Sequence, residues 1–136
     1  MTALTFPSAT FDIVIDKAAM DALMVDEGDV WNPSDEVVRK SGDMCTGIAR
    51  VLKTKGLHLH VSFAQPHFRN KYLLGQHRRE GEKDEGEKDE EERVRREEAA
   101  SQAVCDFGWS LDHETIAGDG GDGCFHHFFY VMQMLE

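Results

Sequence analysis

The chain has 136 residues, which is enough for one domain with a modest hydrophobic core. Its formal net charge of −11 argues against a nucleic-acid-binding protein, because phosphate backbones are held by clusters of Lys and Arg, and a basic protein partner suits it better. The three cysteines, Cys45, Cys105 and Cys124, lie far apart without a Cys-x-x-Cys motif, which disfavours a disulfide framework or a zinc ribbon and indicates a reducing, intracellular compartment.

The N-terminal segment has neither the basic region nor the long apolar stretch of a signal peptide. No window of the chain reaches the about 18 uninterrupted apolar residues of a membrane span. A cytoplasmic protein without a membrane partner is therefore expected.

The first predicted elements are a strand and a short helix. Phe11 to Asp16 is a β-branched apolar run typical of a central parallel strand that is buried on both faces. From Lys17 to Met24 the apolar residues recur at helical spacing, before Gly28, Asn32 and Pro33 open a loop.

A longer amphipathic helix and a second strand are predicted next. Ser34 suits an N-cap, Asp35 and Glu36 place negative charge in the first turn, and apolar residues recur on one face up to Leu52. Lys53, Lys55 and Gly56 would end this helix, and Leu57 to Ser62 would form the strand. A strand, a helix and a strand in this order predict two parallel strands with a right-handed crossover, which indicates an α/β fold.

The second half of the chain contains a charged tract between two structured parts. A short helix is expected within Phe63 to Leu74, and from Gln76 to Glu98 nearly every residue is charged or Gly. Gly81 to Glu85 repeats as Gly86 to Glu90, which is typical of an insertion in a surface loop. We therefore expect residues 1–75 and 105–136 to form one domain, interrupted by a low-complexity insertion at residues 76–104.

Two aromatic-rich segments close the chain. Gly108 to Ile116 and Cys124 to Met134 are separated by the glycine-rich run Gly118 to Gly123, which predicts a β-hairpin. The glycine-rich run resembles a phosphate-binding loop only superficially, because such loops open a helix.

Three segments resemble the class I S-adenosylmethionine-dependent methyltransferases, most closely the elongation factor 1-alpha lysine methyltransferases of the methyltransferase-like group. Leu4 to Leu23 is similar to the family pattern Phe-Asp-x-Val-x-Asp/Glu-Lys-Gly-Thr-x-Asp-Ala, with Ala18 and Ala19 in place of Gly-Thr. Arg50 to Gly56, followed by Ser62 to Arg69 with its Pro-His-Phe-Arg sequence, resembles the turn and fifth strand of the family. Gly108 to Leu111 and Phe125 to Met132 resemble the closing hairpin.

The resemblance implies a partial Rossmann-like sheet, with two parallel strands, a C-terminal antiparallel hairpin and covering helices. It also implies that S-adenosylmethionine is the cofactor, contacted by Met1, Thr2, Asp16 and Lys17. The ordinary alternative is that Asp16 and Lys17 merely end a strand. The family's first strand, its glycine-rich turn and the acidic end of its second strand do not occur in the sequence, so the chain is expected to be inactive alone.

The substrate side is expected near Asp21, His67 and Arg69. Methyl transfer to lysine needs a deprotonated amine aligned with the donor methyl group, so no nucleophilic residue is required. For His67 and Arg69, a local hydrogen bond that stabilises the loop is an equal alternative.

A metal site is the weaker interpretation of the histidines. The candidate ligands are His58, His60, Cys124, His126 and His127, but their spacing matches no known motif, and no metal is expected. Histidines on strands that face a covering helix explain the pattern better.

Two functions remain open at the level of sequence. In the first, which the resemblance implies, the chain is a protein lysine methyltransferase with elongation factor 1-alpha as its protein substrate, and its activity needs residues upstream of Met1. Alternatively, it is a degenerate, non-catalytic fragment that acts as an acidic interaction module through Arg78 to Glu98. In either case the edge of the Phe11 to Asp16 strand would stay exposed and favour self-association.

Overall fold

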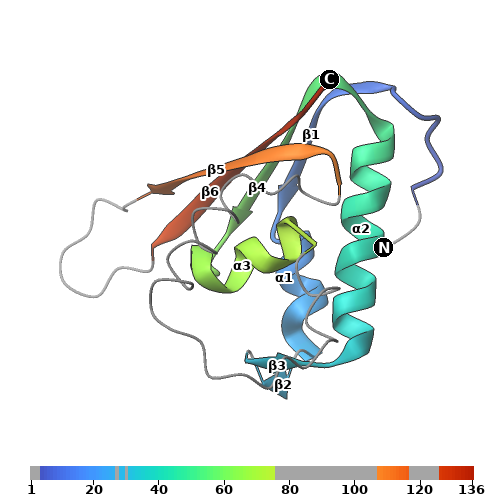
Figure 1. Cartoon of the computed structure of the whole chain (residues 1–136). Coiled ribbons are helices and arrows are strands. Elements are labelled where there is room, and N and C mark those ends of the chain that lie inside the picture. Colours follow the sequence, from blue (N-terminus) through green and yellow to red (C-terminus); the bar gives the residue numbers. More distant parts are fainter. Residues whose placement is uncertain (1–3, 27, 30, 76–106, 117–125) are drawn as a thin grey trace, which may run out of the picture.

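The computed structural model describes residues 4–26, 28–29, 31–75, 107–116 and 126–136 (Figure 1). The elements are β1 (Phe11–Lys17), α1 (Ala19–Leu23), the 3-10 helix η1 (Met24–Asp26), β2 (Gly28–Asp29), β3 (Asn32–Pro33), α2 (Asp35–Val51), β4 (Leu52–Ser62), α3 (Pro66–Leu73), β5 (Trp109–Ile116) and β6 (His127–Met134). Met1, Thr2, the charged tract and the Gly118 to Gly123 run all lie outside the described residues. Among the residues described, no helix is long and apolar enough to cross a membrane.

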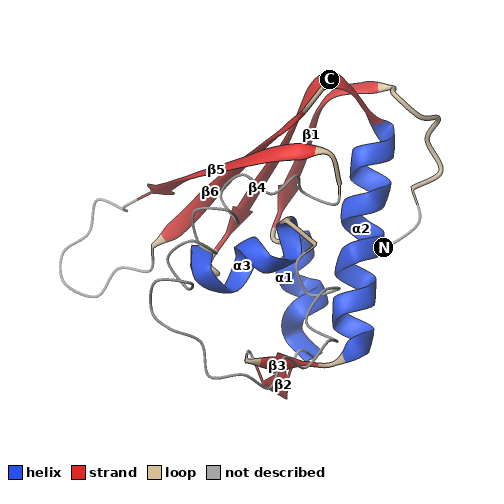
Figure 2. Ribbon diagram, viewed as in Figure 1, coloured by secondary structure: helices blue, strands red, loops and turns tan. Residues whose placement is uncertain are grey.

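The main sheet has four strands in the order β1-β4-β6-β5. β1 and β4 are parallel, with Val14 opposite His58 and Asp16 opposite His60. β6 runs antiparallel to both β4 and β5, so the closing hairpin lies beyond β4 (Figure 2). The predicted α/β fold with two parallel strands and an antiparallel hairpin is confirmed.

The hydrophobic core lies between one face of this sheet and the helices. Met20 of α1, Cys45 of α2 and Leu73 of α3 are buried together with Trp109 and Tyr130 of the hairpin. In the view of Figure 2, the three helices are grouped on one side of the sheet. Residues from before and after the charged tract therefore share one core, while the domain boundaries at residues 75–76 and 104–105 stay a prediction.

Helix α2 begins where the sequence indicates and ends earlier than expected. The Ser34 hydroxyl accepts a hydrogen bond from the Val37 backbone N–H at 3.4 Å, as an N-cap does. The prediction of a stop at Lys53 to Gly56 is wrong, because the helix ends at Val51 and the chain enters β4 directly at Leu52.

An irregularity in β4 explains why the Lys53 to Gly56 segment suggested a helix end. Phe11 pairs with Leu52 while Ile13 pairs with Leu57, so β4 carries extra residues there, and Lys55 adopts a φ of 63°. Gly56 is required at this point, because a Cβ atom on it would lie 2.8 Å from the Lys53 carbonyl oxygen. The glycine marks a close backbone approach rather than a helix cap.

Strand β1 is not buried on both faces, which corrects the prediction of a central strand, while its exposed edge agrees with the expectation from the sequence. It is the edge strand of the sheet, and Ile13 and Ile15 are 52% and 70% exposed. Ile13 and Ile15 lie opposite Leu57 and Leu59 of β4, which are only partly buried. The alternate residues of β4, His58 and His60, face the helices and are fully buried.

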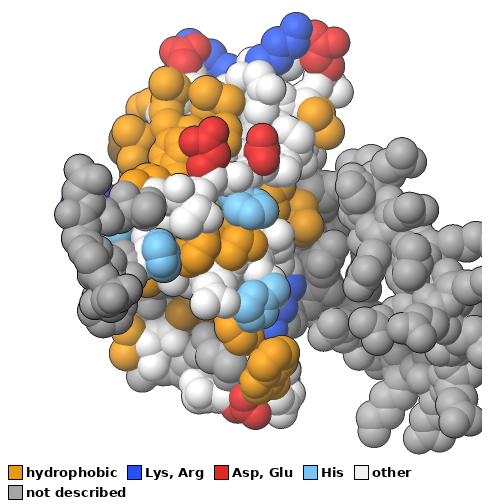
Figure 3. All heavy atoms as spheres, turned by 90° about the vertical axis from the view of Figure 1, so that its left-hand side faces the viewer, with side chains coloured by type: hydrophobic (Ala, Val, Ile, Leu, Met, Phe, Trp, Pro, Cys, Tyr) orange, Lys and Arg blue, Asp and Glu red, His pale blue; other side chains and the backbone are white. Residues whose placement is uncertain are grey.

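The sheet surface opposite the helices, which we call the open face, is formed by apolar residues of β1, β4 and β6. Its members are Ile13, Ile15, Leu57, Leu59, Val61, Phe129 and Val131, as the pairing of the strands requires. None of them is buried, and no described segment covers them. Hydrophobic side chains gather in the upper left of the surface in Figure 3, next to acidic ones.

Candidate functional site

The candidate site lies where the parallel strands β1 and β4 end. Asp16 and Lys17 close β1, Ser62 closes β4, and α1 and α3 begin shortly after these ends. Parallel strands present their carboxyl ends at the same edge of the sheet, and open α/β sheets bind ligands at this edge. The predicted position of Asp16 and Lys17 at a strand end is confirmed by the pairing of β1 with β4.

Asp16 connects the end of β1 to both α1 and β4. One carboxylate oxygen accepts the backbone N–H of Ala19 at 2.8 Å, and the other lies 2.8 Å from Nδ1 of the buried His60. Burial by itself would raise the pKa of the Asp16 carboxyl, but its hydrogen bond with His60, the charge of His60 and the Ala19 N–H outweigh burial and lower the pKa. Both carboxylate oxygens are thus engaged within the protein.

His58 lies next to this pair and is fully buried. Burial, and after it the charge of His60, lowers the pKa of His58 to about 4, although Asp16 acts in the opposite direction. The His58 ring is 5.4 Å from the Trp109 ring, and neither ring nitrogen has a hydrogen-bond partner in the described part of the chain. A neutral, packed histidine accounts for this arrangement.

The described residues also contain no group of three or more His, Cys, Asp or Glu side chains placed to hold a metal ion. Cys124, one of the candidate ligands, lies outside them.

Asp21 and Arg69 meet across the same edge of the sheet. Nη2 of Arg69 on α3 lies 2.6 Å from Oδ1 of Asp21 on α1, and the Ser62 hydroxyl donates to the same oxygen at 2.5 Å. Arg69 is 4% exposed, so the ion pair is largely shielded from water. The fold thus brings together two of the three residues expected on the substrate side.

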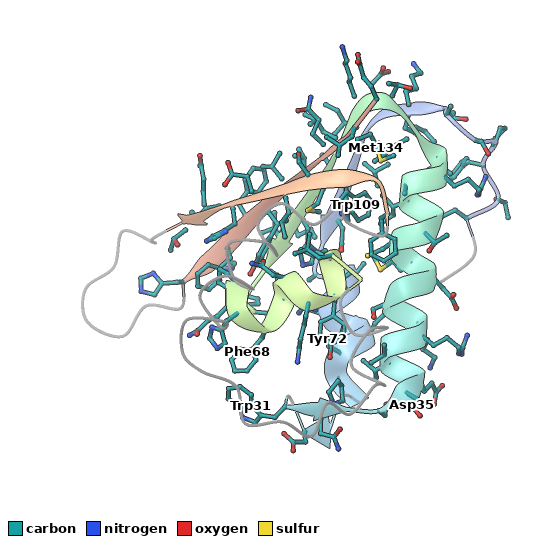
Figure 4. The ribbon with its side chains drawn as sticks, viewed as in Figure 1. Trp31, Asp35, Phe68, Tyr72, Trp109 and Met134 are labelled. Atoms are coloured by element: carbon teal, nitrogen blue, oxygen red, sulfur yellow. The ribbon has the colours of Figure 1, made fainter. Side chains whose placement is uncertain are left out.

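The third expected residue, His67, contacts the ring of Phe68. It is exposed on the first turn of α3, and its ring centroid lies 3.9 Å from that of Phe68. Phe68 in turn contacts the ring of Trp31, at 5.1 Å between centroids (Figure 4). Sequence reasoning missed Trp31, although an aromatic residue between the turn residues Gly28 and Pro33 was a usable signal.

Lys17 lies at an open, mostly apolar cavity of about 520 Å³. The cavity lies between the end of β1 and the two helices α1 and α2, and its lining includes Leu4, Val14, Ala22 and Met44. Among the described residues of the lining, the charged ones are Lys17 and Asp16, and the Asp16 carboxylate is already engaged. These residues fit a flat apolar group such as an adenine, but they offer no unengaged acidic group for a ribose, so they fit only part of S-adenosylmethionine.

Comparison with known proteins finds no family model that matches the chain. Curated relatives match part of the chain by sequence. Bovine (Bos taurus) EEF1A lysine methyltransferase 4 is 37% identical over 75 residues, which is 55% of this chain and 29% of the relative. The mouse (Mus musculus) eEF1A lysine and N-terminal methyltransferase is 40% identical over 81 residues, which is 60% of this chain and 11% of that protein. Over the matched residues, the chain is similar to these methyltransferases.

A solved structure agrees with this family at the level of fold. A SAM-dependent methyltransferase from Methanosarcina mazei superimposes with a TM-score of 0.50 and 20% identity, and the match covers 98% of this chain and 64% of that one. The chain spans less than a third of the first relative's length and about a tenth of the second's.

The departure at Ala18 from the family's sequence pattern has a visible consequence. Ala18 precedes α1 with a φ of 63° and a ψ of 6°, in the left-handed region that favours glycine. The family pattern has Gly here. The chain therefore adopts a glycine-favouring turn at Ala18 while carrying a residue that strains it.

Proposed function

We propose that the chain contributes the β1–β4 edge and the closing hairpin to an S-adenosylmethionine-dependent protein lysine methyltransferase, and that it is inactive alone. The main support is the sequence identity with two relatives named as methyltransferases that act on lysine of eEF1A. The carboxyl edge of β1 and β4, with Lys17 at its cavity and Asp21 paired to Arg69, agrees with a binding role. We extend the proposal to elongation factor 1-alpha as the substrate and to a cytoplasmic location.

Methyl transfer to lysine requires that the two reactants be positioned correctly, and it does not require a reactive side chain. S-adenosylmethionine supplies the methyl group, and the lysine amine must reach it deprotonated and in line. In this proposal Asp21 and Arg69 are positioning residues, because their shared ion pair fixes α1 against α3 at the edge where the substrate would enter. Met1, Thr2, Asp16 and Lys17 are proposed on the cofactor side and His67 on the substrate side.

A titration with S-adenosylmethionine tests the first half of the proposal. Isothermal calorimetry of the purified chain should give no saturable heat, because the described residues fit only part of the cofactor. Binding at micromolar concentration would contradict the proposed dependence on further residues.

A chimera tests the second half. The chain is fused behind the N-terminal part of the bovine relative, in place of the matching segment, and incubated with elongation factor 1-alpha and the cofactor. Methyl-lysine detected by mass spectrometry would support the proposal. An unmethylated substrate, from a chimera that binds cofactor normally, would favour the alternative of a non-catalytic interaction module.

We also propose that the isolated chain associates with a second copy through β1. Its outer edge is unpaired among the described residues, and Ile13 and Ile15 are exposed beside it. Edge strands with exposed apolar side chains pair readily with other chains.

A further inference from the structure

Three aromatic side chains form an exposed ledge that the sheet edge does not require for packing. We call Trp31, His67 and Phe68 the aromatic ledge. Trp31 is 75% exposed, and its ring meets that of Phe68 edge-on, with an interplanar angle of 67°. Figure 4 shows Trp31 and Phe68 one above the other at the end of the molecule where β2 and β3 lie.

The turn that carries Trp31 is held by the backbone rather than by the indole. Asp29 and Asn32 pair across β2 and β3, and the Asp29 carboxylate accepts the Trp31 backbone N–H at 2.9 Å. The indole therefore adds little burial to the fold, and it is presented on a fixed turn. Rigid aromatic side chains displayed in this way are typical of protein-binding surfaces.

The ledge adjoins the proposed substrate side. Phe68 and His67 lie in the first turn of α3, and the next residue, Arg69, forms the ion pair with Asp21. Trp31 reaches the same helix from the β2–β3 turn. A protein segment lying on the ledge would thus lie next to the carboxyl edge of β1 and β4.

The charges around the ledge favour a cation. Asp29 and Asp35 are exposed, Asp29 precedes Trp31 by two residues, and the chain as a whole carries a net charge of −11. Nearby basic groups are already engaged, since Arg69 pairs with Asp21 and the Lys71 ammonium lies 5.5 Å from the Tyr72 ring centroid. Lys and Arg side chains bind aromatic faces through both their charge and their aliphatic stems.

We propose that the aromatic ledge binds a Lys or Arg side chain that flanks the target lysine in the protein substrate. This assignment rests on the proposed function only in supposing that the bound side chain lies next to a lysine that becomes methylated. The binding of a basic segment by Trp31 and Phe68 is a property of the chain itself and is measurable without catalysis.

Tryptophan fluorescence provides the test, because the chain has two tryptophans and the other one, Trp109, is buried and donates to the Leu73 carbonyl. The probe is a peptide of alternating Lys and Gly, and the comparison peptides carry acetyl-lysine or Glu in place of Lys. We expect a saturable change in emission with the lysine peptide, and affinity about two- to fivefold weaker with the acetylated one, because acetylation removes the charge and keeps the stem.

Variants assign the binding to the ledge. Calorimetry with the lysine peptide should show weaker binding by Trp31→Ala and Phe68→Ala, and near-normal binding by Trp31→Phe, which keeps an aromatic face. Phe6→Ala is the matched control, because Phe6 is also exposed, at 50%, but precedes the opposite end of β1. A circular dichroism spectrum like that of the unsubstituted chain establishes that each variant is folded.

The assignment is overturned if the lysine peptide gives no saturable signal, if acetyl-lysine binds equally well, or if Phe6→Ala weakens binding as much as Trp31→Ala. An emission change on diluting the chain alone would indicate contact between two copies and would also overturn it. An inactive chimera with normal peptide binding would count against the proposed function alone. An active chimera whose KM for the protein substrate is unchanged by Trp31→Ala would count against the ledge alone.

Discussion

At the scale of single residues, Ala18 has a backbone conformation that is unfavourable for any residue with a Cβ atom. Its φ of 63° costs an L-residue with a Cβ about 1–2 kcal/mol, and glycine avoids this cost at the expense of a more flexible unfolded chain. We expect Ala18→Gly to raise the free energy of unfolding by up to about 1 kcal/mol, measured as a higher urea midpoint. Ala22→Gly, in the interior of α1, is the matched control and should lower it by about 0.5–1 kcal/mol.

The buried imidazole of His58 makes a second prediction at this scale. Its pKa is about 4 in the folded chain and about 6.5 for an ordinary exposed histidine, so between these pH values the unfolded chain binds a proton that the folded chain does not bind. Stability should therefore fall as the pH drops from about 6.5 to about 4, by at most about 1 kcal/mol per pH unit. The Asp16 carboxyl, whose pKa is also lowered, adds its own loss of stability only as the pH falls below the ordinary aspartate value of 3.8.

Urea unfolding at several pH values measures this slope. The variant His58→Leu has similar volume and no titrating ring, and His58 has no hydrogen-bond partner in the described part of the chain to lose. The variant should lose most of the slope between pH 6.5 and pH 4 while keeping its stability at pH 7. An unchanged slope would mean that another group titrates in this range.

At the scale of elements, the ion pair between α1 and α3 fixes the carboxyl edge of the sheet. Asp21→Asn keeps the side-chain shape and removes the charge that faces Arg69, which is 4% exposed. Leaving a buried charge unpaired is strongly destabilising, and because Asp21 is partly exposed we expect a loss of about 2 kcal/mol in thermal or urea unfolding. Asp43→Asn, which breaks the exposed Arg39–Asp43 pair at 3.0 Å, is the matched control and should cost less than about 1 kcal/mol. Equal losses in the two variants would contradict a structural role for the buried pair.

The elements also show why a local pattern can mislead. The Lys53 to Gly56 segment has the residues of a helix end, yet it lies in β4. The reason is that the chain pairs with β1 from Leu52 onward, directly after α2 ends at Val51. Helix α2 itself followed the sequence closely, since its cap and its apolar face are local features.

At the scale of the whole molecule, the open face and the outer edge of β1 dominate the behaviour we expect in solution. The isolated chain should elute in size-exclusion chromatography at an apparent mass that rises with concentration. Ile15→Lys places a charge on the exposed edge and should shift the chain toward the monomer. Val25→Lys, at a residue 79% exposed on η1, is the control and should leave association unchanged. A monomer at all concentrations would contradict self-association through β1.

The sequence alone determined the order of the elements, the parallel pair and the closing hairpin, because these depend on short-range periodicity, capping and turn residues. It also placed Asp16, Lys17, Asp21 and Arg69 near one edge, since parallel strands end together. Only the tertiary structure decided which oxygen each of these side chains meets, that Asp16 is engaged by His60, and that Trp31 lies against Phe68. Such contacts join residues that are tens of positions apart, and the relative placement of two elements, rather than the pattern within either one, decides whether they form.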